Sequence, residues 1–185
     1  MSSSSSKNSN DSRVKILESR QIYAGTSITL GVERFRLPNE ITINKEIVIF
    51  PEVVAIAPLL SDSRIILIEQ YRYPIRKVLF EIPAGKMRRY EDPLSTAKRE
   101  LEEETGYRAS KLEEILRFYP APGYSTELIH LYRATNLSLV RPRPAEDELI
   151  KVRAMDLEEA LSGIADGSIM DAKTIIAIQR MTKGS

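Results

Sequence analysis

The sequence predicts an α+β fold, in which many short strands are followed by a few separate helices. Apolar and polar residues alternate over most of residues 14–47, and several short apolar runs follow. Helix signals are confined to residues 91–106 and to the last thirty or so residues, which argues against a doubly wound sheet. At 185 residues the chain can form one domain with an accessory sheet and a sizeable core.

The N-terminal third divides into a tail and an accessory sheet. Residues 1–13 are rich in Ser and Asn and poor in apolar residues, so we expect a disordered tail. Residues 14–47 alternate in the manner of strands, with turn signals at Gly25 and in "LPNE", and predict an antiparallel sheet. We expect residues 48–185 to form the main domain.

The main domain begins with two apolar runs, "VVAIAPLL" and "RIILIEQYRY", joined by "SDSR" in a predicted hairpin. A short strand, "VLFEIPAG", should end at Pro83 and Gly85. A helix follows in "EDPLSTAKRELEEETG", with Pro93 near its start and Gly106 at its end. Two strands around a Pro/Gly loop, one further strand and two terminal helices complete the prediction.

Composition excludes several classes of function. The formal net charge is +1, so we expect no nucleic-acid partner and no attraction to anionic membranes. The absence of Cys excludes thiolate chemistry and agrees with a reducing compartment, and the single His makes a zinc site improbable. No apolar run is long enough to span a bilayer, so we expect a cytoplasmic protein.

The helix over residues 91–106 carries a cluster of carboxylates. At about 100° per residue, Glu100, Glu103 and Glu104 share one face. The neighbouring face is apolar and suits a core; its residues are Leu94, Ala97 and Leu101. Arg99 precedes Glu103 by four residues, a spacing at which an ion pair can orient a carboxylate. Oxygen ligands without His or Cys favour Mg²⁺, or Mn²⁺, and the alternative is an ordinary solvated acidic face.

The spacing from Gly85 to Tyr107 resembles the Nudix box, with Glu91, Arg99, Glu100, Leu101, Glu103, Glu104 and Gly106 at the positions of its signature. The resemblance implies an α/β/α sandwich around a mixed sheet. It also implies hydrolysis of a nucleoside diphosphate linked to another moiety, with divalent metal bound by this helix. Glu100, Glu103, Glu104 and the carbonyl of Ala84 would be metal ligands, and Glu103 and Arg99 would serve catalysis.

Three stretches outside the box resemble the ADP-ribose pyrophosphatase branch: "EQYRYP", "FEIPAGK" and "YPAPGYSTELIHLY". This resemblance implies that ADP-ribose is cleaved to AMP and ribose 5-phosphate. Arg72 could bind phosphate or a base through its planar guanidinium, or could be a surface ion-pair partner. Tyr124, Ser125 and Glu127 could contact ribose or the diphosphate-bound metal, although Tyr124 could instead be a packing aromatic.

The same branch places its general base in an acidic loop before a strand, and "RPAEDELIKV" fits that description. Glu146 would activate water and Glu148 would approach a metal, with an exchange of the two roles, or a solvated turn, left open. The lone His130 sits in an alternating strand, where a structural role is expected.

The resemblance also implies a homodimer built through the N-terminal sheet, with Tyr23, Arg34 or Phe35 near the partner. Other substrates compete with ADP-ribose, because the box contacts only metal and diphosphate. They are NADH, a diadenosine polyphosphate, a nucleotide sugar or an oxidised nucleotide. The remaining alternative is a module that binds ADP-ribose without cleaving it.

Overall fold

The computed structural model describes residues 13–140 and 149–182. These residues form two compact units. The first unit extends to Phe50 and includes Ala121–Thr126, whereas the second unit contains Pro51–Pro120 and the described residues from Glu127 onward. Residues 1–12 of the expected tail lie outside the described residues.

The first unit is built on a three-stranded antiparallel sheet, which confirms the predicted N-terminal sheet. Its strands are β1 (Lys15–Ala24), β2 (Thr29–Arg36) and β3 (Thr42–Ile49), in the order β1-β2-β3. The segment Ala121–Thr126 joins this unit by backbone pairing, because Val48 donates to the Tyr124 carbonyl at 2.8 Å and Thr126 donates to the Val48 carbonyl at 3.0 Å.

The second unit contains a mixed sheet. In the described part of the chain this sheet has seven strands, which are β4 (Val53–Ser61), β5 (Arg64–Arg72), β6 (Lys77–Glu81), β7 (Ala84–Lys86), β8 (Tyr107–Phe118), β9 (Ile129–Leu139) and β10 (Ile150–Asp156). The order β10-β5-β4-β9-β8 forms the main path, with β6 on β5 and β7 on β4. Strands β4 and β9 are parallel, and the other pairs are antiparallel.

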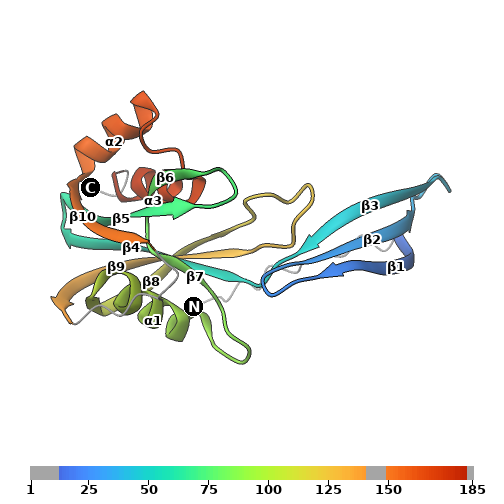
Figure 1. Ribbon diagram of the computed structural model, residues 1–185, viewed down its shortest axis with the longest axis horizontal. Helices are drawn as coiled ribbons and strands as arrows, with labels where there is room; N and C mark the ends of the chain where they lie inside the picture. Colours follow the sequence, from blue (N-terminus) through green and yellow to red (C-terminus); the bar gives the residue numbers. More distant parts are fainter. Residues whose placement is uncertain (1–12, 141–148, 183–185) are drawn as a thin grey trace, which may run out of the picture. The chain divides into compact units, whose positions relative to one another are not determined.

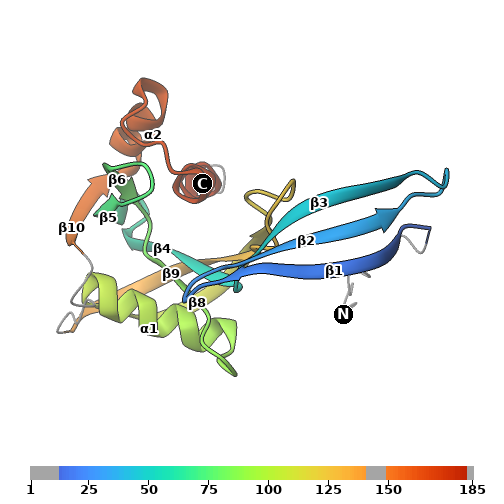
Figure 2. The ribbon, with the colours of Figure 1, turned by 45° about the vertical axis from the view of Figure 1, so that its right-hand side comes forward.

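Helices cover both faces of this sheet. Helix α1 (Pro93–Thr105) lies on one face, and α2 (Leu157–Asp166) and α3 (Ala172–Thr182) lie on the other (Figures 1 and 2). The continuous apolar runs of β4 and β5 are buried between these layers, as strands covered on both faces require. This arrangement confirms the α+β class and the expected three-layer sandwich. Each of these three helices is too short, or too polar, to cross a membrane.

The chain changes its pairing partner at Pro83, where we had expected the strand to end. Strand β6 pairs with β5 as far as Glu81, and β7 then pairs with β4. The Pro83 carbonyl accepts a hydrogen bond from the Ile56 backbone at 2.9 Å, which ties the junction to β4. Proline lacks an N–H, so it interrupts one ladder while its carbonyl takes part in another. The result is a short extra strand immediately before the box helix.

Candidate functional site

The site is centred on α1, whose ends follow from local sequence. Asp92 is the N-cap, and its Oδ1 accepts hydrogen bonds from the backbone of Leu94 and Ser95 at 3.0 and 3.1 Å. Pro93 opens the first turn, where its missing N–H costs nothing. Gly106 ends the helix at a φ of 71°, a left-handed conformation that favours glycine. The predicted end at Gly106 is therefore confirmed, and the helix itself begins at Pro93, so Glu91 lies outside it.

The two predicted faces of α1 are both partly buried. Ala97 and Leu101 pack into a core with residues of β4 and β9, whereas Leu94 in the first turn remains 39% exposed. The carboxylates are also covered, with Glu100 9% and Glu104 3% exposed. Buried carboxylates require compensating partners, so the interpretation as an ordinary solvated face is wrong for these two residues.

Arg99 donates hydrogen bonds to three acidic residues of the site. Its Nε and Nη2 donate to the two oxygens of Glu91, each at 2.9 Å, in a bidentate pair. Its Nη1 donates to Glu100 and, at 3.1 Å, to Glu103, the partner expected from the four-residue spacing. A longer bond of 3.3 Å joins Nη2 to the Lys86 carbonyl. One guanidinium therefore holds three box carboxylates.

These contacts change the acidity of Glu91. The hydrogen bond from Arg99 lowers the pKa of Glu91 to about 2, with help from the Arg88 backbone N–H and against the opposing effect of burial. The same carboxylates raise the pKa of Arg99, with Glu91 making the largest contribution. The pair is thus fully ionised at neutral pH. Sequence spacing alone did not reveal the pairing, because Glu91 lies outside the helix.

Strand β7 brings backbone groups against the α1 carboxylates. The Ala84 N–H donates to Oε2 of Glu104 at 3.0 Å. A Cβ placed on Gly85 would lie 1.9 Å from Oε1 of Glu100, so a larger residue there would force the Glu100 carboxylate or β7 to move. The "PAG" backbone therefore lies against the helix, through the amide of Ala84 and the bare Cα of Gly85.

The donor chemistry of this face suits a hard divalent cation. Glu100, Glu103 and Glu104 offer carboxylate oxygens only, and Gly85 places bare backbone beside the Glu100 carboxylate. Among the described residues, however, no three acidic or His side chains are arranged to hold one ion together. Glu100 and Glu103 converge on the Arg99 guanidinium instead.

Arg72, predicted to bind substrate, is neither isolated nor a simple surface ion pair. Its Nε and Nη2 donate to Glu81 of β6, both at 2.6 Å, and Glu81 is only 1% exposed. Burial would raise the pKa of Glu81, but the bonds from Arg72 and the charge of Lys173 lower it. Neither Glu81 nor Lys173 was predicted to lie in the site; the charged residue within the apolar strand "VLFEI" was the available signal.

The other predicted residues are distributed along the chain. Tyr124 and Ser125 belong to the first unit, and Tyr124 is 61% exposed, so the interpretation as a packing aromatic is wrong. Glu127 belongs to the second unit, where burial raises the pKa of its carboxyl group against the lowering effect of the Lys173 charge. Glu146 and Glu148 lie outside the described residues.

The lone His130 is buried in β9, as a structural role would require. Its Nε2 lies 2.6 Å from Oε2 of Glu52, and its Nδ1 lies 3.2 Å from Oε1 of Glu114. Each ring nitrogen therefore lies within hydrogen-bond distance of a carboxylate. None of the described α1 carboxylates is among its hydrogen-bond partners.

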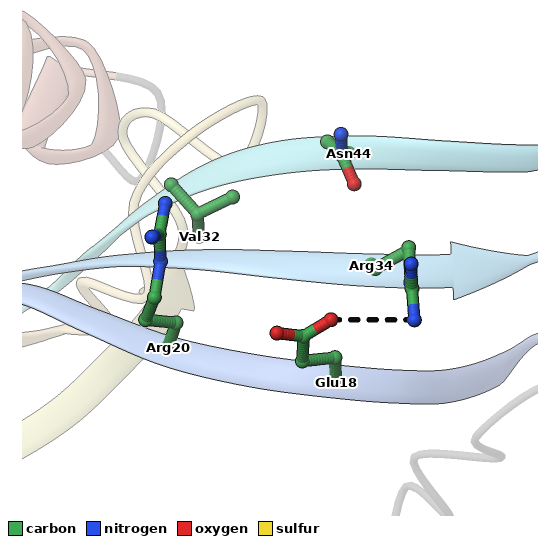
Figure 3. A pocket seen from close by; sticks show the side chains of 5 residues that line it. All are labelled: Glu18, Arg20, Val32, Arg34 and Asn44. Carbon is green, nitrogen blue, oxygen red and sulfur yellow. Dashed lines mark ion pairs between the residues drawn. The ribbon is translucent and has the colours of Figure 1, made fainter.

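A concave patch on the first unit is lined by Glu18, Arg20, Val32, Arg34 and Asn44 (Figure 3). Arg34 and Glu18 form an ion pair across it at 3.3 Å. Of the residues predicted to lie near a dimer partner, Arg34 lines this patch. The carboxylates of α1 belong to the other unit.

Comparisons with known proteins agree with the box helix. The NUDIX domain matches residues 50–175. The ADP-ribose pyrophosphatase of Bacillus subtilis (strain 168) is 41% identical over 167 residues, and the methanol dehydrogenase activator of Bacillus methanolicus is 42% identical over 167 residues. Each alignment covers 89% of this chain and 90% of the relative. A crystal structure of an ADP compounds hydrolase shares the fold, with a TM-score of 0.82, 21% identity and 92% coverage of both chains.

Proposed function

Because this chain belongs to the Nudix family, we propose that it is a pyrophosphohydrolase that cleaves ADP-ribose to AMP and ribose 5-phosphate with Mg²⁺. The observation that carries this function is the pair of nearly buried carboxylates, Glu100 and Glu104, held on α1 beside β7, where a Cβ on Gly85 would lie 1.9 Å from Glu100. The relative from Bacillus subtilis, similar over nearly its whole length, supports the choice of substrate.

The metal site comprises Glu100, Glu103, Glu104 and the Ala84 carbonyl, with Glu148 as a further ligand. Mg²⁺, or Mn²⁺, bound there supplies charge neutralisation for the diphosphate and lowers the pKa of water. The all-oxygen donor set supports this choice of ion. Arg99 fixes the rotamer of Glu103 through their hydrogen bond at 3.1 Å.

The reaction is a displacement at phosphorus. The oxygen of water forms a new bond to one phosphorus, the bridging P–O bond breaks, and the proton leaves the water for Glu146. The leaving phosphate departs with the electron pair of the broken bond. Arg72 binds the substrate through the guanidinium N–H groups that Glu81 does not use, and Tyr124, Ser125 and Glu127 contact the ribose or the diphosphate. These roles rest on the resemblance stated for the flanking stretches.

A homodimer through the first unit completes the proposal. Strand β1 is exposed along its whole length, and apolar side chains such as Ile16, Ile22 and Tyr23 are among its exposed residues. A sheet edge with exposed apolar residues is a common interaction surface. We place Tyr23, Arg34 and Phe35 near the partner. The near-zero formal charge supports the absence of a nucleic-acid partner, and the lack of Cys supports a cytoplasmic location.

A second candidate substrate is NADH. The methanol dehydrogenase activator among the relatives favours it, because many dehydrogenases use nicotinamide dinucleotides, in which a pyrophosphate joins two nucleotides. A nucleotide sugar or a diadenosine polyphosphate presents the same diphosphate to the α1 carboxylates. Only the groups attached to the diphosphate distinguish these compounds.

A substrate panel tests the function. The purified protein is incubated with Mg²⁺ and separately with ADP-ribose, NADH, diadenosine polyphosphates, nucleotide sugars and nucleoside triphosphates, and the products are resolved by chromatography. We expect AMP and ribose 5-phosphate from ADP-ribose at the highest kcat/KM. Preferred cleavage of NADH would establish the second candidate. Binding of ADP-ribose without cleavage of any compound would establish a binding module and overturn the proposed activity.

A further inference from the structure

Four charged side chains form a row in the second unit, beginning at Arg72. Arg72 donates hydrogen bonds from one edge of its guanidinium, Nε and Nη2, to both oxygens of Glu81 at 2.6 Å. Lys173 of α3 donates from its Nζ to Oε2 of the same carboxylate and also to Oδ1 of Asp171, the latter at 2.9 Å. Positive and negative charges therefore alternate from Arg72 to Asp171.

The inner end of the row is fixed to the backbone. Oδ2 of Asp171 accepts hydrogen bonds from the N–H and the hydroxyl of Thr174, at 3.0 and 2.6 Å. Oγ1 of Thr174 in turn accepts the N–H of Ile82 at 2.8 Å, in the residue that follows Glu81. The start of α3 is thus tied to the end of β6. Lys173 and Glu81 are held together although 92 residues separate them in sequence.

This network is poorly explained as a source of stability. A buried ion pair loses solvation, and a well-packed apolar pair in its place is often as stable or more stable. Arg72 alone already provides Glu81 with a bidentate partner, so the second cation is not needed to satisfy both carboxylate oxygens. What Lys173 adds is orientation, because a carboxylate held from two sides cannot rotate.

Arg72, at the outer end of the row, is the residue proposed to contact the substrate. The Arg72 side chain is 39% exposed, whereas those of Lys173 and Glu81 are only 11% and 1% exposed. The charges of Asp171 and Glu104 help to raise the pKa of Arg72, after the larger effect of its bond to Glu81 and against its own burial. Arg72 is therefore within electrostatic range of an α1 carboxylate. Its Nη1 has no hydrogen-bond partner among the contacts of the described residues.

We propose that Lys173 and Glu81 are positioning residues, which lock the guanidinium of Arg72 so that its free edge meets a phosphate of the substrate. This rests on the proposed function for the identity of the substrate. A guanidinium whose rotation is already restricted loses less entropy when it binds a phosphate. Removing Lys173 therefore weakens binding through Arg72 while the groups that cleave the bond stay in place.

A double-mutant cycle between Arg72→Lys and Lys173→Met tests this, with full-length protein, Mg²⁺ and ADP-ribose. Arg72→Lys keeps a cation beside Glu81 but removes the fork, so Glu81 is never left without a cation. We expect each single variant to raise KM about tenfold with kcat changed less than about threefold, and the double variant to be no worse than Arg72→Lys alone. Lys173→Arg should restore most of the wild-type KM.

Lys111→Met is the matched control, because Lys111 pairs with Glu113 at the protein surface. Its KM should equal that of the wild type. Independent, multiplicative effects of the two substitutions would overturn the proposal and leave Lys173 with a purely structural role. A fall in kcat alone would also overturn it.

Calorimetric titration with ADP-ribose in the absence of metal separates this proposal from the proposed function. If the wild type binds ADP-ribose but never cleaves it, the proposed function fails. The double-mutant cycle is then repeated with the Kd for ADP-ribose as the measured quantity. Equal losses in the single variants without a further loss in the double variant would still support the positioning role. If the wild type neither binds nor cleaves ADP-ribose, both proposals fail.

Discussion

At the scale of single residues, the site depends on carboxylates that are held in partly buried positions by specific partners. Glu100 and Glu104 are covered by β7, and Glu91, Glu100 and Glu103 share the guanidinium of Arg99. Removing a carboxylate from water is costly unless a cation or a donor accompanies it. The same requirement makes these positions suitable for a metal ion.

Glu104→Gln should abolish most activity without unfolding the protein. The amide oxygen of Gln can still accept the Ala84 N–H, which lies 3.0 Å from the carboxylate. The charge of a proposed metal ligand is lost, so kcat should fall on the order of 100-fold or more, while the melting temperature stays within a few degrees. Glu102→Gln is the control, because Glu102 pairs with Arg108 outside this cluster and should retain full kcat. Equal activity of the two variants would contradict the metal site.

Glu91 makes the stability of the protein depend on pH. Its pKa is lowered from 4.5 to about 2 by Arg99, so its contribution is fully present above pH 4.5 and is lost as the pH falls toward 2. Glu91→Gln should reduce the free energy of unfolding by about 1 to 2 kcal/mol at pH 7, after allowance for screening by solvent. Urea denaturation at pH 7, 5 and 3 should show this difference shrinking at the lowest pH. A constant difference would exclude the ion pair as its source.

At the scale of elements, the change of partner between β6 and β7 builds the site. Strand β6 carries Glu81 beside β5, and three residues later β7 lies on β4 against α1. One short stretch of backbone thus contributes to both the Arg72 network and the α1 carboxylates. Pro83 allows this change because it ends one hydrogen-bond ladder and its carbonyl joins the next.

Gly85→Ala should displace Glu100 and disable the site. The new Cβ would lie 1.9 Å from the Glu100 carboxylate, so either the side chain or β7 must move. We expect a loss of about 1 to 3 kcal/mol of stability and a large fall in kcat. Gly31→Ala is the control, because a Cβ there would meet its nearest atom at 3.6 Å, an ordinary contact. A wild-type kcat in Gly85→Ala would show that catalysis does not require Glu100 in its observed position.

At the scale of the whole molecule, the first unit exposes large apolar side chains that its own three-stranded sheet does not bury. Strand β1 is exposed throughout, and Ile16 and Tyr23 contribute large apolar side chains. A sheet of this size gains stability by packing against another surface. A second copy of the chain is the proposed partner.

The dimer can be measured directly. Light scattering at micromolar concentration should give twice the mass of the chain, and Ile16→Lys should raise the dissociation constant about tenfold or more by placing a charge in the interface. Leu139→Lys is the control, because Leu139 is an exposed apolar residue of the second unit. A monomeric wild type would exclude the proposed dimer.

Much of the fold was predictable because its signals are local. The alternation in β1 to β3, the apolar runs of β4 and β5 and the caps of α1 all depend on neighbouring residues, and the structure confirms them. The spacing of Glu100, Glu103 and Glu104 placed them on one helix face, and the family resemblance is confirmed by the domain match. The assignments of Glu146 and Glu148 stay predictions, since both lie outside the described residues.

The sequence by itself determined the box helix, its caps and its family, because helical periodicity and capping act over a few residues. Only the tertiary structure decided which charges meet. Arg99 reaches back to Glu91, β7 moves to β4, and Lys173 meets Glu81 across 92 residues. Such contacts depend on which strands pair and where α3 packs, and no local pattern of residues specifies these choices.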